Sequence, residues 1–159
     1  MPFDRSIIDR YAAQSAEVRA AVAGLSREEL LAFPIPGTWS IQQVIIHIQD
    51  SDLIGIDRMK RIIAQSNPLI IGYDETAFTQ SLACDKQSID DALMIFEVAR
   101  RQFAVVLHTL PDAAFERTGI HSERGKIRLA DQVQGYVDHV AHHLRFVRAK
   151  LEKLKGGVR

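Results

Sequence analysis

Four long segments with helical periodicity constrain the fold of this chain most strongly. Within each segment, apolar residues recur every three or four positions, as expected for helices that bury one face. These segments cover residues 5–23, 40–65, 88–110 and 129–155. Gly24, Asn67-Pro68 and Pro111 interrupt the pattern, because glycine and proline commonly end helices. Four amphipathic helices of this length predict an all-α, four-helix-bundle protein of the kind in which helices pack around one shared core.

The connections between these helices are of unequal length. Residues 67–87 are more than a bundle hairpin needs, so we expect one long crossover connection, with a helical turn at about residues 75–82. Ser26 and Glu29 have the spacing of a capping box and predict a short helix after the first long one. Residues 117–128 predict a loop or a short hairpin, and Gly156-Gly157 is expected to end the last helix.

Length and charge limit the class of protein. The 159 residues fit a single domain spanning residues 1–159. The 20 Lys and Arg residues are balanced by 20 Asp and Glu residues, which disfavours a general nucleic-acid-binding protein because counterion release needs clustered cations. No apolar run approaches the ~20 residues of a membrane span, so we expect no membrane partner. The single cysteine, Cys84, and a charged N-terminus without a signal-peptide pattern favour the cytoplasm, with Cys84 an inert thiol rather than a nucleophile.

Three of the six histidines lie in the last helical segment, within a single stretch of five residues. Helical geometry places His139 and His143 on one flank of the apolar stripe, about 100° and 60° from Val140, whereas His142 faces away at about 160°. An i, i+4 histidine pair can bind one metal ion, but a third ligand is needed for a firm site. His47, at the edge of the apolar arc of the second long segment, is the candidate for that ligand.

The alternative is that these histidines bind no metal. His47 would then be a half-buried packing residue, and the pair in the last helix would be incidental. His108 and His121 have no partner at ligand spacing. We expect His108 near the end of the third helix, where a cation suits the helix dipole, and His121 exposed to solvent in a loop.

Two motifs in this chain resemble those of the DinB-like proteins, and more narrowly the YfiT-like proteins. The first is WSIQQVIIHIQDS at residues 39–51, with tryptophan followed by His-x-x-Asp-Ser, and the second is YVDHVAHHL at residues 136–144, with His-x-x-His-His. The resemblance implies a four-helix bundle with unusual connectivity. It also implies a divalent metal, zinc or nickel, held by His47, His139 and His143.

The resemblance extends to function. It implies a small-molecule substrate and either a hydrolase or a transferase, the latter a thiol S-transferase that uses a low-molecular-weight thiol. Asp50, at the acidic position of the first motif, is a weak catalytic candidate: it could orient an imidazole or accept a proton, or it could simply be solvated. Asp52 falls within an apolar arc without an evident reason. Trp39 is expected to pack over the end of the bundle, with lining of a substrate pocket as the alternative.

Two classes of function therefore remain open. A metal-dependent enzyme needs an open coordination position beside a cleft. The alternative is a non-catalytic, stress-related metal-binding bundle that could form a homodimer. Such a bundle would close the site with a fourth protein ligand, and no residue has convincing spacing for that. The sequence shows no nucleophile and base paired as in serine or cysteine hydrolases, so any chemistry is expected to depend on the metal.

Overall fold

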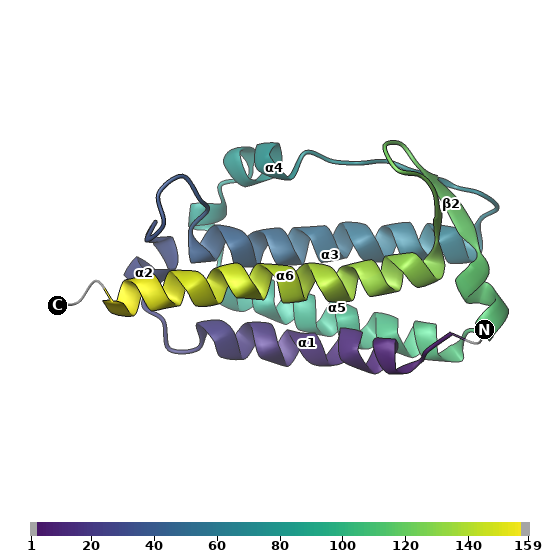
Figure 1. Ribbon diagram of the computed structural model, residues 1–159, viewed down its shortest axis with the longest axis horizontal. Coiled ribbons are helices and arrows are strands. Elements are labelled where there is room, and N and C mark those ends of the chain that lie inside the picture. Colours follow the sequence, from purple (N-terminus) through teal and green to yellow (C-terminus); the bar gives the residue numbers. More distant parts are fainter. Residues whose placement is uncertain (1–2, 157–159) are drawn as a thin grey trace.

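Four long helices lie side by side along one axis in the computed structural model, which describes residues 3–156 (Figure 1). They are α1 (Ser6–Val22), α3 (Ile41–Ala64), α5 (Ile89–Thr109) and α6 (Leu129–Gly156). Their bounds lie within one or two residues of those expected from the hydrophobic periodicity. The predicted all-α four-helix bundle is confirmed.

The topology of the bundle is not a simple up-and-down arrangement. Helices α1 and α3 lie at opposite corners, and each packs against both α5 and α6. Helices α1 and α6 run in one direction, and α3 and α5 run in the other (Figure 1). Because α3 and α5 are parallel, the chain between them must return along the length of the bundle, which is the expected crossover.

The crossover carries three short elements, β1 (Leu69–Ile70), α4 (Glu75–Ser81) and the 3-10 turn η1 (Cys84–Lys86). Helix α4 is the predicted helical turn. It lies against α3 on the outside of the bundle, near the end where α3 begins (Figure 1). The crossover therefore covers the N-terminal half of α3, where His47 lies.

The hairpin alternative for residues 117–128 is confirmed. After the 3-10 turn η2 (Asp112–Glu116), strands β2 (Thr118–His121) and β3 (Gly125–Arg128) pair antiparallel, and β2 also pairs in parallel with β1. The expectation that His121 is exposed was wrong, since only 4% of its surface is accessible. His121 lies opposite Ile70 in the register, and this pairing with a distant two-residue strand cannot be seen in the local sequence.

The predicted helix starts are confirmed by their capping bonds. The Ser40 hydroxyl accepts a hydrogen bond from the Gln43 N–H, and the Gln43 side chain accepts one from the Ser40 N–H. Ser26 forms the same capping box at α2 (Arg27–Leu31). Helix α6 continues through Gly156, and Gly157 lies outside the described residues.

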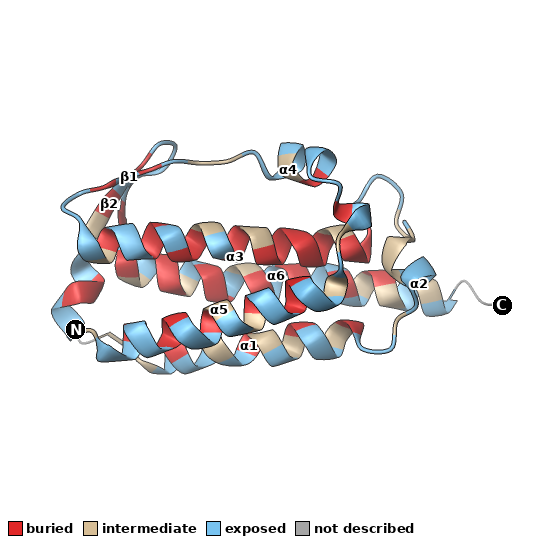
Figure 2. Ribbon diagram, turned by 180° about the vertical axis from the view of Figure 1, so that it is seen from behind, coloured by how far each residue is buried: buried red, intermediate tan, exposed pale blue. Residues whose placement is uncertain are grey.

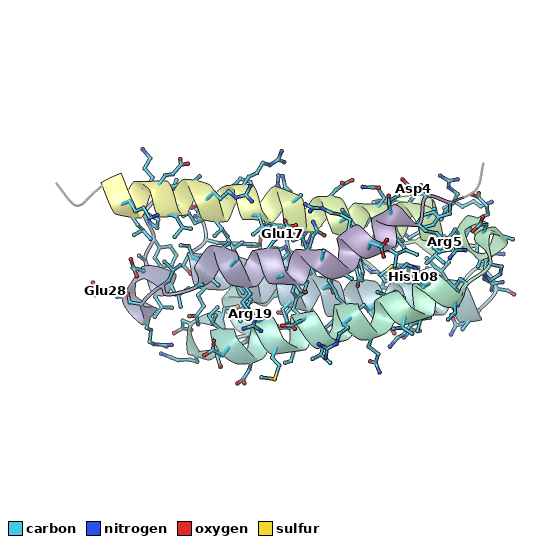
Figure 3. All side chains as sticks on the ribbon, turned by 90° about the horizontal axis from the view of Figure 1, so that it is seen from below. Asp4, Arg5, Glu17, Arg19, Glu28 and His108 are labelled. Atoms are coloured by element: carbon cyan, nitrogen blue, oxygen red, sulfur yellow. The ribbon has the colours of Figure 1, made fainter. Side chains whose placement is uncertain are left out.

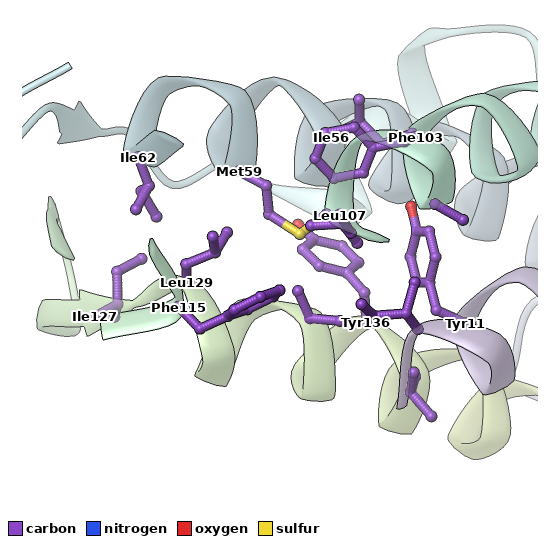
Figure 4. Close-up of a cluster of buried hydrophobic side chains, with 14 of the residues drawn as sticks. Tyr11, Ile56, Met59, Ile62, Phe103, Leu107, Phe115, Ile127, Leu129 and Tyr136 are labelled. Carbon is purple, nitrogen blue, oxygen red and sulfur yellow. The ribbon is translucent and has the colours of Figure 1, made fainter. Parts of the chain in front are cut away.

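Buried residues recur along all four long helices (Figure 2). Most of their apolar side chains form two clusters, one towards each end of the bundle. The cluster nearer the sheet contains the rings of Tyr11, Phe103, Phe115 and Tyr136 (Figure 4). The other cluster is dominated by aliphatic residues of α3 and α6. Among the described residues, no helix is long and apolar enough to cross a membrane.

A buried ion pair lies between the core helices and explains the position of Asp52. Arg100 of α5 is fully buried, and its Nη2 and Nε atoms donate to Asp52 Oδ1 at 2.6 and 2.9 Å. The guanidinium also donates to Gln14 Oε1 at 2.9 Å and to the carbonyl oxygens of Tyr11 and Tyr136. The two charges satisfy one another within otherwise apolar helix faces, so Asp52 is a structural residue.

Charged side chains cover the outer surface of α1 and α5 (Figure 3). His108 lies in the last turn of α5, as expected, and its Nε2 is 3.1 Å from Asp9 Oδ1. Arg19 of α1 likewise pairs with Glu97 of α5 at 3.1 Å. Both pairs are exposed, so each contributes little to the free energy of unfolding.

Candidate metal centre

Three imidazoles converge between α3 and α6, in the half of the bundle where α3 begins. His47 Nε2 lies 3.1 Å from His139 Nε2 and 3.2 Å from His143 Nε2. One nitrogen from each ring lies within 4.8 Å of the others. The helices are antiparallel neighbours, and an early turn of α3 lies beside the middle of α6. The structure thus brings together the three residues that the sequence singled out.

His142 is not part of this cluster. Its side chain is exposed, and its Nδ1 lies 2.9 Å from Arg145 Nη2. This agrees with the helical geometry, which predicts that His142 faces away from the core.

The donor set fits one divalent metal ion. Four ligands arranged tetrahedrally at about 2.0–2.1 Å from zinc lie about 3.3–3.4 Å apart, close to the nitrogen separations found here. Burial lowers the pKa of His47 to about 4 and the pKa values of His139 and His143 to about 3. All three imidazoles are therefore neutral at pH 7, the form that binds metal.

Acidification is expected to destabilise the metal-free protein between pH 7 and pH 5. In the unfolded chain these imidazoles titrate near 6.5, so below that pH the unfolded state binds more protons than the folded state. Stability from the neutral cluster is therefore complete above about pH 6.5 and decreases as the pH falls. Each imidazole contributes about 2 kcal/mol to the loss between pH 7 and pH 5, so we expect the free energy of unfolding to fall by about 5–6 kcal/mol over that range. Urea unfolding of chelator-treated protein measures this loss, and an unchanged free energy over that range would contradict the assigned neutral cluster.

An open pocket of about 480 Å³ leads to the cluster. Its walls come from residues 35–39 and from the part of α6 between His139 and Lys150, and Phe146 and Val44 make it partly apolar. The Trp39 ring lies 5.0 Å from the His47 ring, so Trp39 both packs at the end of the bundle and lines the pocket. A larger hollow of about 600 Å³ lies between the end of α1 and the start of α5, and none of the three histidines lines it.

No fourth histidine, cysteine or acidic side chain completes the cluster within residues 3–156. An ion held by three imidazoles would therefore keep at least one coordination position for another ligand. Open positions of this kind are typical of catalytic metal sites, and closed four-ligand sets of structural ones.

Glu75 is a functional candidate that sequence analysis missed. It lies at the start of α4, and its Oε2 is 3.7 Å from His47 Nε2. Its side chain is 58% exposed and also lines the pocket. Only the path of the crossover brings Glu75 to the cluster, so residue spacing alone gave no signal for it.

Two other sequence candidates differ in their surroundings. Asp50 lies one turn beyond His47 and is half-buried, and burial raises the pKa of its carboxyl group. None of the hydrogen bonds in the described part of the chain joins it to the three histidines, and its catalytic role stays a prediction. Cys84 is a buried free thiol whose pKa is raised by burial, which agrees with an inert rather than a nucleophilic cysteine.

Comparison of the sequence with known protein families shows the superfamily to which the chain belongs. The sequence model of the DinB superfamily matches residues 10–147, which is most of the chain. The chain belongs to the DinB superfamily. A Bacillus mycoides protein named "putative metal-dependent hydrolase" is 28% identical over 138 residues, 87% of this chain and 79% of that protein. An Oceanobacillus iheyensis protein of the same name is 30% identical over 130 residues, 82% of this chain and 75% of that protein.

Two solved structures share the fold of this chain. YfiT from Bacillus subtilis, described as "a probable metal-dependent hydrolase with an unusual four-helix bundle topology", superposes with a TM-score of 0.89 at 23% identity. The match covers 94% of this chain and 86% of YfiT. YjoA, a DinB-like protein from the same species, gives a TM-score of 0.64 at 12% identity over 94% of this chain and 92% of its own. Both likenesses show that this chain shares the fold of these two proteins.

Proposed function

We propose that this DinB-superfamily protein is a metal-dependent hydrolase that acts on a small molecule. One observation carries the proposal: three neutral imidazoles converge beside an open pocket, with no fourth ligand from the described residues. The names of the two bacterial relatives support the reaction class. The metal we propose is zinc or nickel, because imidazole suits both ions.

The residues around the pocket have separate roles in this proposal. His47, His139 and His143 hold the ion, and an ion in such a site supplies Lewis-acid chemistry that makes a water or a thiol a better nucleophile at neutral pH. Glu75 accepts the proton of the nucleophile, because its carboxylate lies beside His47 on the pocket side. Trp39 and Phe146 provide an apolar wall for the substrate.

Thiol S-transfer is the second candidate, because Glu75 is placed to accept the proton of a low-molecular-weight thiol as readily as that of water. We further propose a cytoplasmic protein, since its single cysteine is a free thiol.

An activity screen with metal-restored protein tests this function. Zinc- and nickel-loaded samples are assayed for hydrolysis of p-nitrophenyl esters and N-acyl amino acid amides, and for transfer of cysteine or glutathione to 1-chloro-2,4-dinitrobenzene. We expect turnover in a hydrolysis assay that disappears in His139→Ala. Turnover only in the transfer assay would replace hydrolase with transferase. A metal-loaded protein no faster than His139→Ala in every assay would support a non-catalytic metal-binding bundle instead.

A further inference from the structure

A buried lysine lies in the same pocket, two helical turns beyond the histidine cluster. Lys150 of α6 is only 2% exposed, whereas Lys153 and Lys155 at the end of the same helix are exposed. Lys150 lines the pocket together with His143 and Phe146. Lysine is rarely buried to this extent without a charged partner.

The contacts of Lys150 leave its charge uncompensated. Its Nζ donates to the Thr38 hydroxyl oxygen, and the Thr38 hydroxyl in turn donates to the Ile35 carbonyl oxygen at 2.8 Å. Thr38 is therefore a neutral acceptor, and it uses one of the three N–H donors of the ammonium. Among residues 3–156, no carboxylate pairs with Lys150.

Lys150 lacks the charged partner that Arg100, another buried cation, has. Arg100 is buried too, but it has the Asp52 carboxylate and three further oxygen acceptors. Burial lowers the pKa of Lys150, because it removes part of the water that would solvate the ammonium. An unpaired cation in a pocket wall destabilises the fold unless an anion enters the pocket and pairs with it.

We propose that Lys150 and Thr38 form a recognition site for the anionic end of the substrate, a carboxylate or phosphate group, while the reacting end lies at the histidine cluster. This inference rests on the proposed function and adds the substrate class. His143 and Lys150 are seven residues apart, or about 10 Å along the helix axis. Lysine side chains on a helix lean towards its N-terminus, so the ammonium lies nearer to the cluster than its backbone does. The substrate is then an organic anion whose charged group is separated from its reacting group by several atoms.

Paired probes that differ only in charge test this site. The probes are 6-mercaptohexanoate and 6-mercaptohexan-1-ol, which share a thiol for the metal and a six-carbon chain. Trp39 is the only tryptophan of the chain and lines the pocket, so its fluorescence reports binding of either probe. Cobalt-loaded protein gives a second signal, the visible absorption band of a cobalt–thiolate bond.

We expect native protein to bind the carboxylate at least about tenfold more tightly than the alcohol. Lys150→Met should reduce that preference to about twofold or less, and Lys150→Arg should retain part of it. Lys153→Met is the matched control, because it removes the same charge from an exposed position on the same helix. The melting temperature should rise in Lys150→Met, by about 2–4 °C, because a buried unpaired charge has been removed.

The outcomes separate this inference from the function on which it rests. A carboxylate preference that survives in Lys150→Met, or that Lys153→Met abolishes equally, overturns the anion site. Failure to take up cobalt counts against the metal centre alone, because Trp39 fluorescence still compares the two probes in metal-free protein. In metal-free protein, 6-mercaptohexanoate should still bind more tightly than 6-mercaptohexan-1-ol, and this preference should still depend on Lys150. If metal-free protein binds the alcohol but shows no preference for the carboxylate, the inference is contradicted.

Discussion

Replacing Arg100 with methionine is expected to lower the free energy of unfolding by about 3–5 kcal/mol, the usual loss when one member of a buried ion pair is removed. The substitution keeps much of the side-chain volume but leaves the Asp52 carboxylate buried without its cation. It also removes donors to Gln14 and to two backbone carbonyl oxygens. Urea unfolding followed by circular dichroism measures the change.

Arg101→Met is the matched control for this prediction. Arg101 is the next residue of α5, is exposed, and pairs with Glu97 at 3.6 Å across one turn. Its loss should change the free energy of unfolding by less than about 0.5 kcal/mol, as is usual for exposed pairs. The double variant Asp52→Asn with Arg100→Met should be less destabilised than the sum of the two single variants, because neither charge is then left alone. Equal effects of Arg100→Met and Arg101→Met would contradict the structural role of the pair.

The second large effect is expected for catalysis. Glu75→Gln should reduce the turnover found in the activity screen by about 10²–10⁴-fold, the usual contribution of a general base. The amide has nearly the same shape but cannot accept the proton. Metal content should remain that of the native protein, since Glu75 is not one of the three clustered histidines.

Asp50→Asn is the informative comparison for Glu75→Gln. Asp50 was the acidic residue indicated by the sequence motif, whereas Glu75 is the acidic residue that the structure places 3.7 Å from His47. We expect the rate of Asp50→Asn to fall less than that of Glu75→Gln. A larger loss of rate in Asp50→Asn than in Glu75→Gln, at unchanged metal content, would indicate that Asp50 rather than Glu75 accepts the proton.

The helices and the histidine cluster could be predicted because their signals are local and periodic. Serine caps at positions 26, 40 and 88 set the starts of helices, and each side chain accepts the expected N–H bond. The angle between His139 and His142 on one helix separated the inward from the outward histidine. These inferences need only helix geometry and not the path of the chain through space.

The remaining features depend on contacts between distant segments. Glu75 reaches the cluster only through the crossover, and His121 is buried in a strand that pairs with residues some fifty positions earlier. The Arg100–Asp52 pair, in contrast, has a local signal in the sequence. Arg100 lies in the apolar stripe of α5 between Phe96 and Phe103, just as Asp52 lies in that of α3. Two opposite charges in two apolar stripes predict a buried pair.

Metal content per chain tests the central claim most directly. Native protein, purified without an affinity tag and measured by elemental analysis, should carry about one divalent ion per chain. His139→Ala should lose most of it, and His142→Ala should retain it, because His142 is exposed and outside the cluster. Equal metal in the native protein and His139→Ala, or loss of metal in His142→Ala, would contradict a site formed by His47, His139 and His143.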